Sequence, residues 1–212
     1  MFLGFVFNLK IISEELQKGV KTDMLKEMKD SEKDAVLEVA DLMLAAAKTA
    51  PKGSGKDTIR GFVITGDEKA KLAEKMRRLA SSYDLPFFLR DGNNIDNSHA
   101  VVILGSIQKP FGLNECGMCG FPTCGEMRKN HGRCAFNITD LGIAIGSAVS
   151  VASNHRIDNR VMYSAGRAAV LLDYFVKAGT PDAEEVEIAY GIPLYTGAKS
   201  IFFDRNPGAV LL

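Results

Sequence analysis

The sequence predicts a globular protein of mixed helices and strands, in the α/β or α+β class. Apolar residues at helical spacing alternate along the chain with short β-type runs, and neither an internal repeat nor a low-complexity segment interrupts them. The chain has 212 residues, 46% of them hydrophobic, which is enough to bury a core in one large or two small domains.

The chain begins with a short apolar run, Met1–Phe7, which Lys10 soon interrupts. The run is too short to span a bilayer, and no basic segment of the kind that opens a signal peptide precedes it. We therefore expect no membrane contact. Residues 1–30 are interpreted as an N-terminal extension whose apolar start packs on the core or on a second subunit.

The first helix is expected from about Ser31 to Ala50. Its acidic opening suits a helix N-terminus, and apolar residues recur at helical spacing from Val36 to Ala47. A loop, Pro51–Lys56, then leads to a β-type run, Ile59–Thr65.

A second amphipathic helix is expected after Gly66. The next segments are predicted to be a short strand over Leu85–Leu89, a turn over Asp91–Asn94 and a fully buried strand over Ala100–Leu104.

Beyond the cysteines, Thr139–Asp140 is expected to cap a helix that runs to about Asn154. The helix is apolar on nearly every face, which indicates burial in a core or a subunit interface, and Gly142 and Gly146 would permit close backbone approach there. The remaining expected elements are a helix over Arg160–Lys177, a short helix over Ala183–Tyr190 and a last strand over Ile201–Phe203.

Charge and cysteine placement narrow the function. The 26 basic and 26 acidic residues balance, which argues against nucleic-acid binding. The four cysteines lie within Cys116–Cys134, whereas a disulfide framework spreads its cysteines to connect distant loops. Clustered cysteines favour metal ligation in a reducing compartment, so we expect a cytoplasmic protein.

The cysteines follow the pattern C-x2-C-x4-C-x9-C and are the candidate metal ligands: Cys116, Cys119, Cys124 and Cys134. Soft thiolates suit iron–sulfur clusters, and four of them complete a [4Fe–4S] shell. Gly117, Gly120 and Gly125 fit a chain that must curl tightly around a cluster. Structural zinc also takes four cysteines and stays an alternative; the tighter C-x2-C-x2-C run of two-cluster ferredoxins is absent.

The stretch Cys116–Cys124 resembles the iron–sulfur domain of corrinoid iron–sulfur proteins and of Rnf-type electron-transport complexes, with its C-G-x-C-G-Phe/Tyr-Pro-x-C motif. The resemblance implies a bound iron–sulfur cluster. The fourth cysteine, Cys134, comes sooner here than in those proteins.

The loop Gly53–Lys56 is not a P-loop. That motif needs a glycine where this chain has Ala50 and a hydroxyl where it has Asp57, and the expected order is helix–loop–strand instead of strand–loop–helix. ATP hydrolysis is therefore excluded.

The same region resembles the nitroreductase family. Ala47–Lys56, followed by Phe62–Ile64, is similar to that family's helix ending in Ala-Pro-Ser-Ser-Gly-Asn before a core strand, and Ile188–Pro193 resembles its Ile-Gly-Tyr-Pro turn. Taken whole, residues 30 to 206 resemble the uncharacterised ferredoxin domain-containing protein family. This resemblance implies an α+β, nitroreductase-like three-layer sandwich over residues 31–212, an iron–sulfur loop at 112–137, and a homodimer with flavin at its interface.

The flavin site departs from the nitroreductase pattern. The Arg-Arg-Ser-x-Arg segment that grips flavin phosphate has no counterpart before the first helix. The replacement phosphate ligands that we expect for FMN are Lys52, Ser54, Lys56 and Arg60. Solvated loop lysines are the alternative interpretation.

The leading hypothesis is a [4Fe–4S] electron-transfer protein coupled to a flavin in a homodimer. The alternatives are a binding or structural module with a four-cysteine zinc site, and a flavin-dependent oxidoreductase. The sequence shows no recognisable catalytic constellation, so an enzyme would be an oxidoreductase whose cofactors carry the chemistry. It does not identify the electron donor or acceptor.

Overall fold

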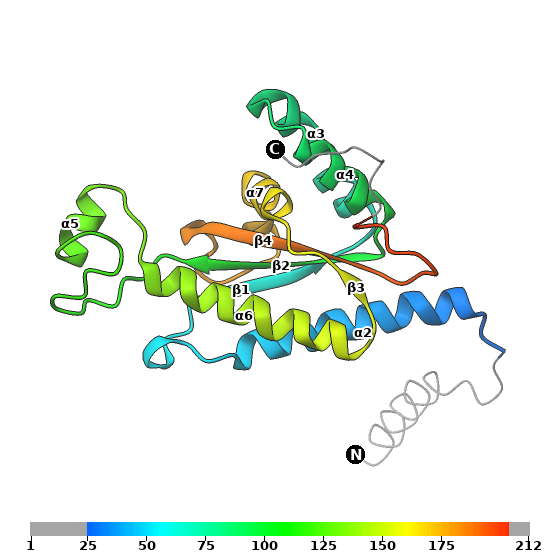
Figure 1. Cartoon of the computed structure of the whole chain (residues 1–212), viewed down its shortest axis with the longest axis horizontal. Helices are drawn as coiled ribbons and strands as arrows, with labels where there is room; N and C mark the ends of the chain where they lie inside the picture. The colour runs from blue at the N-terminus through cyan, green and yellow to red at the C-terminus, as the bar shows by residue number, and fades with distance from the viewer. Residues whose placement is uncertain (1–24, 204–212) are drawn as a thin grey trace, which may run out of the picture. The chain divides into compact units, whose positions relative to one another are not determined.

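The computed structural model describes residues 25–203, and Figure 1 shows the order of their elements. The chain divides into two compact units, Met1–Ser31 and Glu32–Leu212, and the fold lies in the second. The apolar run Met1–Phe7 lies outside the described residues. The interpretation of residues 1–30 as an extension therefore stays a prediction.

Within residues 25–203, a four-stranded antiparallel sheet forms the middle layer, in the order β1-β2-β4-β3. Its strands are β1 (Ile59–Ile64), β2 (Ala100–Ile107), β3 (Asp158–Asn159) and β4 (Val186–Tyr195). β2 is buried along its whole length, which confirms the predicted buried strand. Because every pairing among the described strands is antiparallel, the class is α+β rather than α/β.

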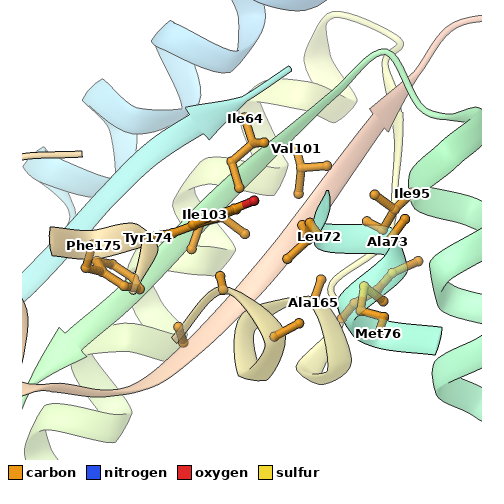
Figure 2. Close-up of a cluster of buried hydrophobic side chains, with 14 of the residues drawn as sticks. Ile64, Leu72, Ala73, Met76, Ile95, Val101, Ile103, Ala165, Tyr174 and Phe175 are labelled. Carbon is orange, nitrogen blue, oxygen red and sulfur yellow. The ribbon is translucent and has the colours of Figure 1, made fainter. Parts of the chain in front are cut away.

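Helices cover both faces of the sheet. Residues alternate between the faces along β2: Val102 and Leu104 pack with one group of helices, and Val101 and Ile103 with the other. The first group is α2 (Met28–Thr49) and α6 (Ala135–Asn154); the second, shown in Figure 2, is α3 (Gly66–Tyr83), α4 (Phe87–Asn97), α7 (Tyr163–Leu171) and α8 (Tyr174–Lys177). The predicted three-layer sandwich is confirmed.

α7 approaches β4 so closely that only glycine fits between them. A Cβ atom on Gly166 would lie 1.9 Å from the carbonyl oxygen of Ala189, which is far inside van der Waals contact. A Cβ on Gly191 would lie 2.5 Å from Cβ of Ala165. The two glycines allow the helix to rest on the strand backbone.

α6 begins at Ala135, one turn before the predicted start at Thr139–Asp140. Asp140 is therefore inside the helix rather than at its cap, and its side chain is buried. Among the described residues, α6 is the one helix that is long and apolar enough to cross a membrane, with a mean hydropathy of 1.4. Its inner face packs in the sandwich with α2 and the sheet, as a core helix does.

The predicted strand Leu85–Leu89 and turn Asp91–Asn94 are wrong, because both segments lie mostly in α4. Phe88 and Ile95 are two helical turns apart and both are fully buried. Gly92 lets α4 approach α3, since a Cβ there would lie 3.2 Å from a carbonyl oxygen of that helix. Packing between the helices therefore overrides the turn-forming residues.

The predicted helix Ala183–Tyr190 is also wrong. A one-turn 3-10 helix is followed by β4, which pairs with β2. The run Ile188–Pro193, which resembles a nitroreductase turn, lies inside that strand. β4 accommodates Pro193 because Gly191 exchanges backbone hydrogen bonds with Met162 on the side away from β2, and residues two apart on a strand face the same side.

The predicted helix Arg160–Lys177 is interrupted. Asp173 adopts a left-handed φ of 55° and separates α7 from α8. The predicted last strand, Ile201–Phe203, is a bend instead. Phe202 is buried there, and its carbonyl oxygen accepts a hydrogen bond from Nη1 of Arg160 over 3.0 Å.

Candidate metal centre

The cysteine loop, residues 112–137, runs from beyond β2 into the first turn of α6 and contains α5 (Cys124–Lys129). In Figure 1, α5 lies outside the layers of the sandwich. Gly112, Gly117 and Gly120 have φ values of 74°, 61° and 82°, which glycine adopts at little cost. The amide of Gly120 donates to the carbonyl of Gly117 over 2.9 Å. The backbone therefore turns tightly within the cysteine motif.

α5 returns the chain toward Cys134. Thr123 caps the helix, since its Oγ1 accepts a hydrogen bond from the amide of Glu126 over 3.2 Å. At the other end, the amide of Gly132 donates to the carbonyl of Met127 over 2.8 Å. A Cβ on Gly132 would lie 2.8 Å from the ring of Phe121, so the closing turn needs a glycine.

All four predicted ligands line one cavity of about 20 Å³. Cys134 is 7% exposed, the other three cysteines are partly exposed, and none of the four is in a disulfide. The larger apolar side chains of the wall are Phe111, Leu113, Met118, Phe121, Met127 and Phe136. The structure therefore brings the four thiols to a single apolar cavity.

The four thiols line one cavity but are not close enough together to form a complete set of metal ligands. Within residues 25–203, no three His, Cys, Asp or Glu side chains lie close enough together to hold a metal ion. The chemistry of the donors nonetheless fits a soft metal, because the cavity wall carries four thiols and no carboxylate or imidazole. Such a set suits an iron–sulfur cluster or zinc.

Cys134 occupies the N-cap position of α6. Its amide donates to Oε1 of Gln108 over 3.2 Å, which joins the end of β2 to the start of the helix. The unpaired N–H groups and the dipole of a helix N-terminus favour negative charge. The position therefore suits a metal-bound thiolate.

Two amide side chains near Cys134 carry polar atoms without partners. Nε2 of Gln108 and both side-chain polar atoms of Asn137 are buried and make no hydrogen bond. Asn137 is fully buried in the first turn of α6. Buried amide atoms are nearly always paired, so these atoms need an explanation.

Arg133, a basic residue of the cysteine loop, is held by other groups of the protein. It forms an ion pair with Glu187 of β4, and its Nη1 donates to the carbonyls of His131 and Gly132 over 2.8 and 3.1 Å. Arg133 therefore ties the cysteine loop to the sheet.

The residues predicted to hold flavin phosphate lie in or near the glycine loop, Gly53–Gly55, and are used differently. Nζ of Lys52 donates to three carbonyls at the end of α2, at 2.7 to 3.0 Å, so its amine caps that helix. Ser54 adopts a left-handed φ of 52° within the loop. Lys56 extends over the ring of Phe111, with 5.0 Å between Nζ and the ring centroid.

Arg60 lies in a different environment from Lys56. Its Nε donates to the carbonyl of Pro181 over 2.8 Å, and its Nη2 pairs with Asp182 at 3.2 Å. Hydrogen bonding from Lys109, reinforced by Arg60, holds the pKa of Asp182 below its usual range. Arg60 and Lys56 line separate grooves. Two of the four predicted phosphate ligands, Lys56 and Arg60, therefore lie at different grooves.

The glycine loop and the cysteine cavity share a wall. The carboxylate of Asp140 accepts the amide of Gly53 at 3.1 and 3.2 Å, which holds the glycine loop against α6. Phe111 lines the cysteine cavity and also packs on Gly53, where a Cβ would lie 2.7 Å from its ring. Its ring centroid lies 5.0 Å from that of Phe136. The sequence indicated Asp140 only as a helix cap and did not indicate Phe111, because it carries no local signal for these long-range contacts.

Two sequence comparisons identify relatives. A family profile described as "Uncharacterized protein containing a ferredoxin domain (DUF2148)" matches residues 130–205, a span that includes one of the four cysteines. A protein of Archaeoglobus fulgidus, described as "Uncharacterized protein", is 38% identical over 193 residues, which is 87% of this chain and 99% of the relative.

Solved structures share the fold at low sequence identity. A nitroreductase with bound FMN from Bacteroides fragilis superposes with a TM-score of 0.53 at 14% identity, covering 82% of this chain and 86% of that one. An FMN-bound nitroreductase from Desulfitobacterium hafniense gives 0.52 at 16% identity, with 85% and 82% covered. A BluB-like flavoprotein from Clostridium difficile gives 0.50 at 16% identity, with 88% of each chain covered. The fold is therefore nitroreductase-like.

Proposed function

The chain belongs to the family of uncharacterized proteins that contain a ferredoxin domain, and on this premise we propose that it is an electron-transfer protein with one [4Fe–4S] cluster. The ligands would be Cys116, Cys119, Cys124 and Cys134. One observation carries the proposal: four free thiols, with no other strong metal-ligating side chain, line a single apolar cavity.

The chain's own residues would hold and shield the cluster. When bound, the cluster would supply one-electron oxidation and reduction. Phe111, Phe121 and Phe136 would keep water from the sulfur atoms, and solvent exclusion is one of the factors that set a cluster's potential. Gln108 fixes the backbone at Cys134, and the N-terminus of α6 favours the charge of the ligated sulfur there.

FMN is proposed as a second redox cofactor at the glycine loop. Two of the structures that share the fold contain FMN. Of the predicted phosphate ligands, Lys56 and its neighbour Ser54 are best placed, because the amine of Lys52 and the guanidinium of Arg60 hold the protein's own carbonyls. Phe111 contacts both regions, so electrons would cross one shared wall between flavin and cluster.

The proposed assembly is a cytoplasmic homodimer formed through the outer face of α6. Ile138 and Ile143 on that face are both 40% exposed, and Gly142 and Gly146 leave open space for a close neighbour. Reduced, clustered cysteines fit a cytoplasmic compartment. The electron donor and acceptor would be separate partners.

A zinc-holding structural module is the second candidate, and the size of the cavity favours it. A volume of about 20 Å³ is close to that of one water site and nearer to a single ion than to a four-iron cluster. Four thiolates in a tetrahedron are also a common structural zinc site. In this case the loop would carry no redox activity.

An absorption spectrum with metal and sulfide analysis, on full-length protein purified without oxygen, separates the candidates. We expect a broad band near about 400 nm that bleaches with dithionite, and about four irons and four sulfides per chain. A colourless protein with one zinc per chain would replace the redox proposal with the structural one.

Flavin analysis of the same preparation tests the second cofactor. About one FMN per chain would support it, and oxidation of NAD(P)H by that preparation would make the protein a flavin-dependent oxidoreductase. A flavin-free preparation that also fails to bind added FMN would remove this part of the proposal.

A further inference from the structure

Gln108 presents a buried hydrogen-bond donor at Cys134. Its amide group bonds the backbone N–H of Cys134, and because a backbone N–H can only donate, the bonded atom must be Oε1. The hydrogen bond therefore fixes the orientation of the side-chain amide. It leaves Nε2, with its two N–H bonds, buried and without a partner.

Asn137 presents a second buried amide close in sequence to Cys134. It lies in the first turn of α6, three residues after Cys134, which caps that helix in an extended conformation. Asn137 is fully buried, with 0% of its surface exposed, and neither of its side-chain polar atoms has a hydrogen-bond partner. Asp140, one turn further, is different because its carboxylate is bonded to Gly53.

The unpaired N–H groups of Gln108 and Asn137 need a hydrogen-bond acceptor. Each buried polar group without a hydrogen bond costs about 1–3 kcal/mol. Nearby buried hydroxyls do find partners, since Oγ of Ser106 donates to Oγ1 of Thr58 over 3.2 Å. The groups that need an acceptor are therefore the two amides: Gln108 is bonded to the backbone of Cys134, and Asn137 lies three residues after Cys134 in the first turn of α6.

We propose that Gln108 and Asn137 are positioning residues whose side-chain N–H groups donate to sulfur at the Cys134 side of the bound cluster. The inference rests on the proposed [4Fe–4S] function. Sulfur carries more negative charge when a cluster is reduced, so a donor stabilises the reduced form more than the oxidised form. The two amides therefore raise the reduction potential.

The test uses full-length protein with the substitutions Gln108→Met and Asn137→Leu, each of which removes an amide of similar size. We expect wild-type iron and sulfide content, and about a tenfold lower ratio of reduced to oxidised cluster at a fixed potential. For a one-electron couple, that ratio corresponds to a midpoint about 59 mV more negative. The midpoint is read by EPR during a dithionite titration.

Asn94→Leu is the matched control. Asn94 is a buried amide whose Nδ2 also lacks a partner, but it lies in α4 on the opposite face of the sheet from α6. Its substitution should leave the midpoint unchanged. Gln108→Glu is the second comparison, because it keeps an acceptor for the amide of Cys134 while removing the donor, and its midpoint should also fall.

The outcomes distinguish this inference from the function beneath it. A wild-type protein without a reversible cluster ends the proposed function. A reversible wild-type cluster with unchanged midpoints in iron-loaded variants leaves the function intact and overturns the role of the two amides. If the variants fail to load iron, pulsed EPR of wild-type protein with nitrogen-15 in the Gln and Asn side chains decides: coupling to the reduced cluster supports the inference, and its absence overturns it.

Discussion

The sandwich and the cysteine loop are held together in different ways. In the sandwich, helices cover both faces of the sheet, and large side chains such as Phe88 and Met76 are fully buried. In the loop, Met127 is buried, but Leu113 and Met118 are 47% and 57% exposed although they line the cysteine cavity. The sandwich is therefore stabilised by its own apolar core, whereas the loop depends on tight turns and, under the proposed function, would also depend on the metal that its cysteines would bind.

The largest effect is expected where the sandwich is most tightly packed. Gly166→Val places a side chain where a Cβ alone would lie 1.9 Å from the backbone of β4. Neither backbone can yield without separating α7 from the sheet, so we expect a loss of more than about 4 kcal/mol and little folded protein. Soluble yield and urea denaturation measure it.

Gly125→Ala in α5 is the matched change in the cysteine loop. A Cβ at Gly125 would meet Oγ1 of Thr123 at 3.7 Å, which is ordinary contact. The free energy of unfolding should stay within about 1 kcal/mol of wild type, with a small gain from the helix preference of alanine. If this substitution were as damaging as Gly166→Val, the loop would be packed as tightly as the sandwich.

A smaller effect is expected where the two regions meet. Asp140→Ala removes the buried acceptor of the Gly53 amide and leaves that N–H unpaired, at a cost of about 2–3 kcal/mol. Asp140→Asn keeps one acceptor and should cost about half as much. Urea denaturation with an unchanged m-value would confirm a stability effect. If both variants were as stable as wild type, the hydrogen bonds from Gly53 would contribute nothing to stability.

Lys52→Met should cost less again. The amine of Lys52 bonds three carbonyls at the end of α2, so its loss should lower the free energy of unfolding by about 1 kcal/mol while FMN binding is retained. Lys56→Met is the companion variant, and it should weaken FMN binding and leave the stability unchanged. The reverse pattern would return the phosphate role to Lys52.

The sequence predicted elements where local pattern and final packing agree. β2 is apolar from Ala100 to Leu104 and is buried throughout, and α3 shows helical spacing that its packing uses. α4 was missed because Gly92, Asn93 and Asn94 are turn formers, and only the approach of α3 makes a helix of them. β4 was missed along its whole length because its partner, β2, lies far away in sequence.

The candidate site likewise contains residues that the sequence identifies and residues that it does not. The four cysteines were recognised because their spacing is local, and the structure places all of them at one cavity. The residues that support the cavity were not recognised, since Gln108 reaches across 26 positions to Cys134, and Gly53 across 87 positions to Asp140. Such contacts leave no periodic signal in the chain.

Loss of the metal should have the smallest effect on the sandwich itself. Cys119→Ser removes one of the four proposed ligands, so the cluster absorbance and the bound iron should be lost. The melting temperature of the sandwich should fall by less than about 4 °C, the shift expected for 1 kcal/mol in a chain of this size. Far-UV circular dichroism and a thermal scan measure the two regions together.

Limited trypsin digestion of the same variant resolves them separately. In iron-loaded wild-type protein the cut sites at Arg128 and Lys129 should be protected relative to the variant, because ligation orders the turns on both sides of α5. Chelator-treated wild-type protein is the control and should match the variant.

The melting temperature gives the contradicting outcome. A fall of more than about 10 °C in the melting temperature of Cys119→Ser would correspond to several kcal/mol of stability. The cluster would then stabilise the sandwich as well as the loop, and the two regions would unfold as one cooperative unit.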